Sequence, residues 1–424
     1  VIVAFLYTVF LLPILMHIRA PQESKVKAAS LSQSVVGQGA SRIQRLLSAL
    51  DGWTCAHPKG VVLVFVGLGA FFVAGASKVV VNTNMAEQYK EATSVRQVIE
   101  TVNTSFGGTG NLELVVDTQE QDGLTDPRIL NLMANMERFL QQEYPALGVK
   151  AYSLVNIVKD TYRKFNEDKP EFYRIPSSPT LLSQLYLMIS SGNPDELGRV
   201  VNDELSLARM SIRLKDPGSG VSVEIVERVQ KEIDKQVKEL RADFPELRVT
   251  LTGNAAFFSK LHDYISWSQI RSFGLAFLII SLILVVIFGS LKVGLLAVVP
   301  NAFPALTIFG VMGWMDVPLG LTTLLVAPVV IGIAVDDTIH FLTHYTLELK
   351  EHGSIRHALG KSTKEVGQAI FFTSVVLGIS FLAFVPISHL GISRFGFLAV
   401  LAIVAAFVAD LVLLPALCLL FRAR

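Results

Sequence analysis

The stretch "GIAVDDTIHF", residues 332–341, places two adjacent carboxylates, Asp336 and Asp337, in one of the most apolar regions of the chain. The seventeen residues before them, "LGLTTLLVAPVVIGIAV" (319–335), carry no charge. A carboxylate at the centre of a bilayer costs roughly 2.5–3.5 kcal/mol on insertion scales, so such residues usually face a protein interior or water and serve a function. Asp336 and Asp337 are therefore expected to have a function that offsets this cost.

The composition is that of a membrane protein. Hydrophobic residues make up 51% of the 424 residues and charged residues only 17%, and the mean hydropathy is +0.49. Soluble proteins of this length are rarely so apolar. The net charge of +1 indicates no nucleic-acid partner. The two cysteines, Cys55 and Cys418, have no metal-ligand spacing, so we expect neither a metal site nor a cofactor other than the proton.

Seven apolar stretches are long enough, or nearly so, to cross a hydrocarbon core of about 30 Å. They cover about residues 1–18, 59–77, 270–289, 293–314, 319–347, 368–388 and 395–421. We therefore expect an α-helical membrane protein with an inserted α/β domain. Its expected parts are the last helix of a preceding repeat (1–18), a cytoplasmic linker (19–58), a membrane helix (59–79), the α/β domain (80–268) and a five-helix bundle (269–424).

Lysine and arginine residues orient the chain. They are concentrated in the segment 19–59, in an expected loop at 348–367 and at the C-terminal "FRAR", three places that the crossings put on one side. Positive charge favours the cytoplasmic side. The domain 80–268 is therefore expected to face the periplasm, and the chain is expected to lie in a bacterial inner membrane.

A short internal repeat concerns the two ends of the chain. "LLPILMHIR" (11–19) can be aligned with "LLPALCLLFR" (413–422), and both close an expected membrane helix just before basic residues. If the first helix ends an earlier repeat, the chain is the second half of a protein about twice its length. A first half or a second chain would then complete the protein. Assembly into a homo-oligomer is a further alternative.

The domain between the second and third apolar stretches is expected to be mixed α/β. Alternation of apolar and polar residues predicts strands at 111–118, 207–216 and 247–253. Helical spacing of apolar residues predicts helices at 127–144 and 222–244. The order strand, helix, strand, then strand, helix, strand suggests two βαβ-like units that share a sheet.

A more apolar helix at 176–192 in this domain allows two interpretations. It can be a core helix, or it can line a path for a greasy substrate, because Met and aromatic side chains accommodate varied apolar ligands. The residues of this candidate path are Leu182, Leu185, Tyr186, Met188 and Ile189.

Two adjacent carboxylates bind and release protons as one coupled unit, which is what a proton relay requires. His340 follows Asp336 by four residues and Asp337 by three, so on a helix it is within reach of either. An interfacial position for His340 is equally compatible. Gly332 would let another helix approach closely. The remaining intramembrane polar residues, which either support the relay or only bond the backbone and pack helices, are Asn301, Thr373, Ser374 and Asp410.

These motifs resemble the resistance-nodulation-division (RND) superfamily of transporters. The nearer likeness is to its lipid-exporting branch, the MmpL-like and hopanoid-transporter-like proteins, related to Patched-type sterol-sensing proteins. The segments that carry the resemblance are "VPNAFPALTIFGVMGW" (299–314), "GIAVDDTIHFLTHY" (332–345), "FFTSVVLGISFLAF" (371–384) and "ADLVLLPAL" (409–417). The resemblance implies that Asp336 and Asp337 match the proton-relay motif of a membrane helix. It also implies that the outer domain is a porter domain.

The resemblance implies a proton antiporter, not an enzyme, that exports lipid, sterol or hopanoid-like molecules, with a periplasmic lipid carrier as a candidate partner. The outer domain is shorter than in drug-efflux members, which speaks against an RND drug or solute pump. The lysine partner of the family is absent from this chain. A sterol-sensing regulator would not need titrating aspartates. An intramembrane aspartyl protease would need aspartates on two helices and a nearby glycine, where this chain has Ala334 and Val335.

Overall fold

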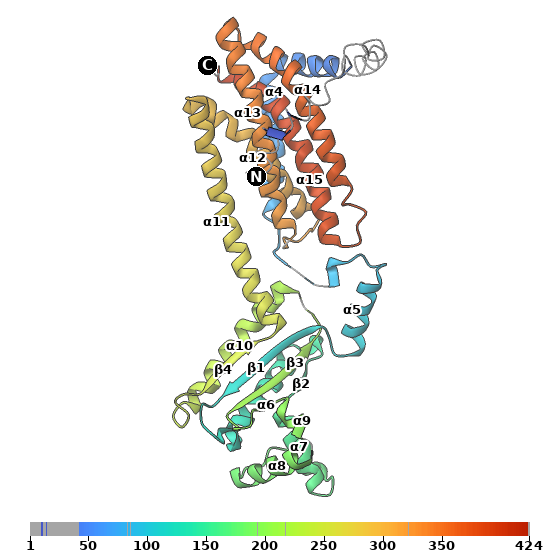
Figure 1. The fold of residues 1–424 in the computed structure, drawn as a ribbon, viewed down its shortest axis with the longest axis vertical. Helices are drawn as coiled ribbons and strands as arrows, with labels where there is room; N and C mark the ends of the chain where they lie inside the picture. Colours follow the sequence, from blue (N-terminus) through green and yellow to red (C-terminus); the bar gives the residue numbers. More distant parts are fainter. Residues whose placement is uncertain are drawn as a thin grey trace.

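The computed structural model describes residues 42–422 except 83, 85, 193, 217 and 321, together with residues 10, 11 and 14. The expected helix 1–18 and most of the expected linker 19–58 therefore lie outside the described residues. Figure 1 shows two parts, a helical bundle and an α/β domain. A long helix, α11 (Asn254–Phe288), runs from one part to the other.

Among the described residues, six helical segments are long and apolar enough to cross a membrane. Their mean hydropathies lie between 1.6 and 2.9. Each contains at least 18 residues, which at 1.5 Å per residue spans roughly 27 Å or more. The segments are Pro58–Ala76, Arg271–Phe288, Leu291–Trp314, Thr323–His352, Ile355–Leu382 and Leu390–Leu420. The protein is therefore a multi-pass membrane protein.

The membrane helices are named as in Figure 1. They are α4 (Pro58–Ala76), α11, α12 (Leu291–Trp314), α13 (Val326–His352), α14 (Ile355–Leu382) and α15 (Leu390–Val408). α15 continues through one π-helical turn, Ala409–Leu413, into α16 (Leu414–Leu420). A further helix, 42–56, precedes α4.

One expectation about the bundle is wrong. The polar stretch 348–367, expected as a loop, is helical except for a tight turn, because α13 runs to His352 and α14 starts at Ile355. Gly353, with φ 69°, adopts the left-handed conformation that ends a helix, and Ser354 accepts a hydrogen bond from His357 N. Local capping signals therefore override the polar composition.

Glycines bring α4 and α12 into direct contact near the C-terminal ends of both helices. A Cβ atom on Gly313 of α12 would lie 1.7 Å from the carbonyl oxygen of Gly75 on α4, and one on Gly310 would lie 2.5 Å from the Phe72 side chain. Trp314 Nε1 donates a hydrogen bond to Phe71 O at 3.0 Å. Small residues permit this close packing of membrane helices. Gly332 differs, because nothing lies within 4 Å of a Cβ at that position.

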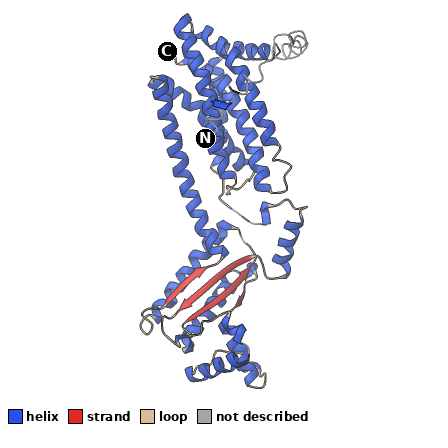
Figure 2. Ribbon diagram, in the orientation of Figure 1, coloured by secondary structure: helices blue, strands red, loops and turns tan. Residues whose placement is uncertain are grey.

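The outer domain contains a four-stranded sheet, and all its adjacent strands are antiparallel (Figure 2). The strands are β1 (Gly110–Asp117), β2 (Lys150–Tyr152), β3 (Leu207–Leu214) and β4 (Arg248–Thr252), in the spatial order β2-β3-β1-β4. β1 and β2 are thus parallel to each other with β3 between them, and β3 and β4 are parallel with β1 between them. This is a split βαβ arrangement.

Alternate side chains of the strands point into the core of the domain. Leu112, Leu114 and Val116 on β1 have no exposed surface. They belong to one buried cluster with apolar residues of the helices α6 (Pro127–Glu143) and α10 (Ser219–Leu240). Buried side chains recur every two residues along a strand and about every 3.6 residues along a helix, which matches the spacing of the apolar residues in the sequence.

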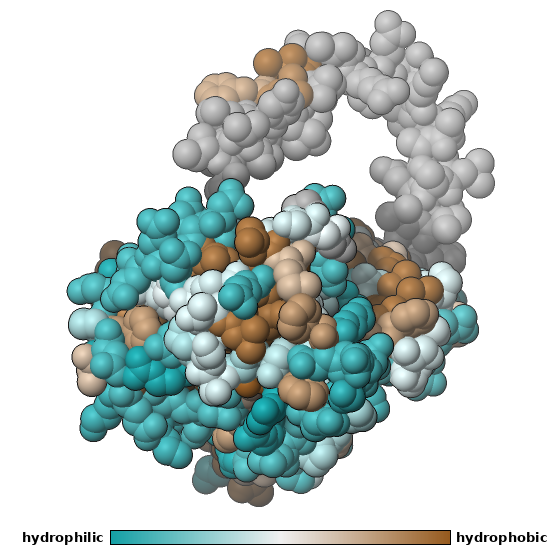
Figure 3. Space-filling model, turned by 90° about the horizontal axis from the view of Figure 1, so that it is seen from below, coloured by the Kyte–Doolittle hydropathy of each residue, from teal (hydrophilic) through white to brown (hydrophobic). Residues whose placement is uncertain are grey.

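Four more helices complete the outer domain. They are α5 (Ser94–Ser105), α7 (Leu154–Phe165), α8 (Pro179–Gly192) and α9 (Pro194–Gly198). The last three lie at the end of the domain farthest from the bundle (Figure 1). Viewed from this end, the described surface is largely hydrophilic with hydrophobic residues near its middle (Figure 3).

Candidate functional site

The aspartate pair lies halfway along α13. The side chain of Asp336 is 74% exposed and that of His340 is 70% exposed, and Asp336 Oδ1 lies 3.6 Å from His340 Nε2. Asp337 is half-buried. One helical turn separates Asp336 from His340, which is why the two side chains meet. This face of α13 is therefore open in the described chain, although it lies in a membrane helix.

A second polar group is completely enclosed by three helical segments. Thr338 of α13 donates a hydrogen bond to Asp410 Oδ1 at 2.6 Å, and its Oγ1 lies 3.3 Å from Asn301 Oδ1 on α12. Asn301 in turn donates from Nδ2 to Ala297 O at 2.8 Å. The exposed fractions of Thr338, Asn301 and Asp410 are 0%, 1% and 1%.

Asp410 has an unusual position in its helix. It lies in the π-helical turn Ala409–Leu413, and such turns are frequent at functional sites. Its second carboxyl oxygen, Oδ2, is buried without a hydrogen-bond partner among the described residues. A buried polar atom without a partner costs about 1–3 kcal/mol, so its retention requires an explanation beyond packing.

Asp337 connects the two groups. It directly follows Asp336 and directly precedes Thr338, which donates its hydroxyl to the buried Asp410. Acidic groups therefore extend from the exposed face of α13 to the interior of the bundle. Proton exchange between them requires short hydrogen-bonded steps, which side chains and water can supply.

The structure brings some predicted relay residues together and leaves others apart. Asn301 and Asp410 join the enclosed group, and His340 lies beside Asp336. Thr373 is exposed on α14, and its hydroxyl donates to Ile370 O of its own helix at 2.9 Å. Ser374 is half-buried on the same helix. Thr373 thus makes the backbone bond that is common for Thr in membrane helices.

The sequence did not single out Thr338, which is central to the enclosed group. Its position directly after the aspartate pair was a usable signal, since the residue after Asp337 points to a third helix face about 100° further round. Threonine in a membrane helix carries little information by itself, because it commonly bonds its own backbone.

The candidate substrate path in the outer domain lies mostly inside its core. Leu182, Leu185, Tyr186 and Ile189 are at most 7% exposed, while Met188 is 47% exposed. Tyr186 donates its hydroxyl to Leu124 O at 2.8 Å, and burial raises the pKa of its phenol. Four of the five residues therefore occupy the positions of a core helix. Beside α8 lies a cavity of about 480 Å³, and Tyr186 is one of its lining residues.

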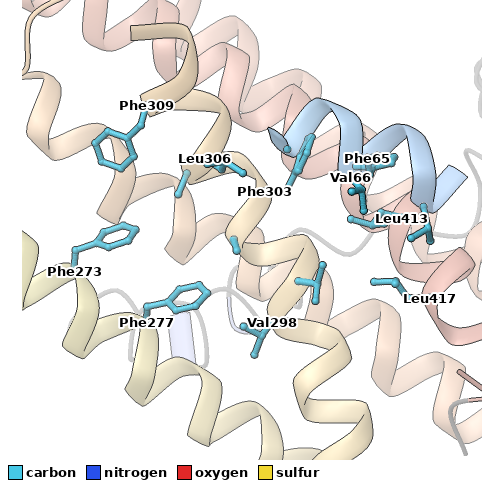
Figure 4. Close-up of a pocket in the computed structure, with 15 residues that line it drawn as sticks. Phe65, Val66, Phe273, Phe277, Val298, Phe303, Leu306, Phe309, Leu413 and Leu417 are labelled. Atoms are coloured by element: carbon cyan, nitrogen blue, oxygen red, sulfur yellow. The ribbon is translucent and has the colours of Figure 1, made fainter. Parts of the chain in front are cut away.

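An apolar groove of about 600 Å³ lies between α4, α11, α12 and α16 of the bundle (Figure 4). Phe273 and Phe277 of α11 point toward α12, and Phe65 of α4 lies beside Phe303 of α12 (Figure 4). The rings of Phe65 and Phe303 are 4.9 Å apart. The sequence does not reveal this groove, because these helices are apolar on most faces.

The fold and the enclosed carboxyl group together define a class. A bundle of membrane helices, an inserted α/β domain and intramembrane acidic residues make the chain a multi-pass membrane protein with an inserted α/β domain. The chain belongs to the MMPL family, whose model matches residues 74–424.

Two relatives show how far the likeness extends. A membrane protein of Methanocaldococcus jannaschii is 22% identical over 381 residues, which are 88% of this chain and 94% of the relative. The crystal structure of a heavy metal efflux pump matches with a TM-score of 0.50 and 15% identity, over 88% of this chain and 48% of the pump. This chain thus spans about half the length of that pump. The predicted MmpL-like resemblance is confirmed by the family model, and at this identity the structural match concerns the fold.

Proposed function

We propose that this protein transports hydrophobic molecules, of the lipid, sterol or hopanoid type, and that protons drive the transport. The observation that carries the proposal is the succession of acidic groups from Asp336, through Asp337, to the enclosed Asp410, which Thr338 joins to the same helix. A charge is expensive inside a membrane, so such groups mark ion or proton pathways. The energy source would be the proton gradient, since one charge crossing 100 mV yields about 2.3 kcal/mol.

The enclosed group offers a two-state element for the relay. Thr338 connects α13 with Asp410 and with Asn301 of α12. A proton arriving on Asp410 removes the carboxylate charge that the Thr338 hydroxyl stabilises. The relative positions of α12, α13 and α15 would then shift, because packed helix interfaces favour discrete arrangements. Coupling of proton occupancy to helix position is what a transporter requires.

The apolar groove supports the choice of cargo. A volume of about 600 Å³ is within the usual range for small-molecule sites, and its lining is almost wholly hydrophobic. Gly69 and Ala302 leave room beside the aromatic side chains. An acyl chain or a sterol ring system fits such a lining, whereas a charged solute would find few polar groups there.

The remaining parts of the proposal follow from the topology. The basic residues orient the chain with the α/β domain in the periplasm of a bacterial inner membrane. The exposed Asp336 side chain requires a cover, so a second repeat half or a second chain would pack on this face of α13. The outer domain would pass the cargo to a periplasmic lipid carrier. Protons would be the coupling ion, without another cofactor.

Transport in proteoliposomes tests the proposal. A fluorescent lipid is followed with and without an imposed proton gradient, using the wild type, Asp336→Asn, Asp337→Asn and the double variant. Ser380→Ala is the matched control, because its hydroxyl is exposed on α14 and bonds only Val376 O. We expect gradient-driven movement to be lost in the double variant and kept in the control. Undiminished movement in the double variant would refute the relay.

A further inference from the structure

Three side chains with metal-binding atoms meet where α13 turns into α14, away from the aspartate pair. They are Glu348 and His352 at the end of α13 and His357 in the first turn of α14. Their ligand atoms all lie within 4.8 Å of one another. The two imidazole rings are 4.6 Å apart between centroids. The proposed transport mechanism uses none of these residues.

Glu348 is the buried member of this cluster. It is 7% exposed, and Lys361 of α14 holds its Oε1 at 2.7 Å. Its other oxygen, Oε2, is buried and accepts no hydrogen bond in the described part of the chain. Oε2 lies 3.4 Å from His352 Nδ1. Lys361 thus fixes the carboxylate so that the unpartnered oxygen faces the histidines, which is the role that outer-shell groups play around metal ions.

Two imidazoles and one carboxylate are a suitable ligand set for Zn²⁺. Bonds of about 2.0–2.2 Å in a tetrahedron place neighbouring ligand atoms roughly 3.3–3.6 Å apart. The separation of Glu348 Oε2 and His352 Nδ1 already has this length. His352 and His357 are exposed, so rotation of their side chains can close the remaining distance and a metal ion can enter from water. Water would take the fourth position.

The positive charge of Lys361 opposes the binding of a metal ion at this cluster. Its ammonium group lies on Oε1 and would repel a second cation. A cluster that served only as a salt bridge between Lys361 and Glu348, however, would need neither His357 nor an Oε2 that accepts no hydrogen bond among the described residues. The histidines bind metal in the neutral form, so they add no further positive charge to the site.

We propose that Glu348, His352 and His357 bind Zn²⁺ and tie the end of α13 to the start of α14. Gly353 and Ser354 form the turn between these helices, and a metal ion across the turn would restrain it. α13 also carries Asp336 and Asp337, and the metal would thereby set how freely this helix moves. The spacing Glu-x3-His-x4-His crosses a helix boundary, and the expectation of no metal site rested on the two cysteines alone.

Zinc titration of the purified full chain tests the site without reference to transport. Zn²⁺ alone is titrated by calorimetry into the wild type, His357→Gln and Glu348→Gln, and X-ray absorption identifies the bound ligands. His344→Gln is the matched control, since this histidine is on α13 but bonds Ser362 Oγ and Glu365 Oε2. We expect one site per chain with two imidazole ligands, weakened at least about tenfold in both variants and unchanged in the control.

Several results would overturn the proposal. The wild type could bind no Zn²⁺, or both variants could bind it as tightly as the wild type. Loss of binding in His344→Gln with normal binding in His357→Gln would place the metal at the His344–Glu365 pair instead. His357 is exposed, so its replacement keeps the test valid even where the buried Glu348→Gln variant fails to fold.

Discussion

Thr338 and Asp410 lie on different segments of the membrane bundle and are joined by a 2.6 Å hydrogen bond that solvent does not reach. Seventy-two positions separate them in the chain. In this low-dielectric interior a lost partner is costly, because the remaining polar atom has no water to bond. The bond therefore ties α13 to the turn that follows α15.

Replacement of Thr338 tests the contribution of this bond to stability. Thr338→Val keeps the size of the side chain but leaves both carboxyl oxygens of Asp410 without a donor. We expect the free energy of unfolding to fall by about 1–3 kcal/mol. Thermal unfolding in detergent measures this loss, and Thr338→Ser, which restores the hydroxyl, should recover most of it. Equal stability of the Val and Ser variants would show that the hydrogen bond between Thr338 and Asp410 does not stabilise the protein.

Asp410→Asn distinguishes the structural role of the carboxyl group, which is to accept a hydrogen bond from Thr338, from its role in binding and releasing a proton. Asparagine keeps an oxygen that can accept from Thr338, so the melting temperature should stay near that of the wild type. It carries no proton that can be exchanged, so gradient-driven lipid movement should fall at least about tenfold if Asp410 belongs to the relay. Normal transport at normal stability would restrict Asp410 to helix packing.

The sequence predicts the membrane helices and the acidic groups better than it predicts their surroundings. Long apolar stretches identify spans through composition alone, and Asp410 and Asn301 were recognised because polar residues are rare there. The exposure of Asp336 was not predicted, because it depends on which neighbour covers α13. The groove was not predicted either, since it arises where uniformly apolar helices diverge, and periodicity cannot report this.

Two glycine substitutions of the same kind should have opposite outcomes. In Gly313→Ala the new Cβ would collide with the backbone of Gly75, so α4 and α12 must separate. We expect a loss of roughly 1–3 kcal/mol or more. In Gly332→Ala the new methyl group meets nothing within 4 Å, and alanine favours a helix by about 1 kcal/mol.

Melting temperatures of the two variants in detergent decide this comparison. The expectation is a decrease for Gly313→Ala and no decrease for Gly332→Ala. A decrease for Gly332→Ala alone would show that another helix already covers this face of α13. An unchanged Gly313→Ala variant would contradict the close approach of α4 and α12.

A large side chain placed in the apolar groove should weaken the binding of an acyl chain there. Ala302 lies in its lining, so Ala302→Trp places an indole among the phenylalanine rings. We expect binding of a fluorescent acyl-chain probe to weaken by at least about tenfold, the amount that corresponds to about 1.4 kcal/mol. Val376→Trp is the control, because Val376 is 62% exposed on α14. Equal weakening by both variants would mean that the probe binds the lipid-facing surface in general.

Acid should loosen the start of α6 in the outer domain. Asp126 accepts a hydrogen bond from Arg128 N at 2.8 Å and caps this helix. The Arg128 side chain, by hydrogen bonding to the carboxylate, holds the pKa of Asp126 below its ordinary value of 3.8. A lowered pKa in the folded state means that the stabilisation is complete above the ordinary pKa and is lost as the pH falls through the lower, folded value.

Hydrogen exchange of α6 peptides in the wild type and in Asp126→Asn measures this effect. At about pH 6 the wild type should exchange more slowly than the variant, and the difference should vanish once the pH falls below the lowered pKa of the folded state, where the carboxylate is protonated in both the folded and the unfolded states. α10 serves as an internal control, because Gly218 caps it without a side chain and no such difference is expected there. A difference in α6 that persists at low pH would show that the cap acts through its shape and not through its charge.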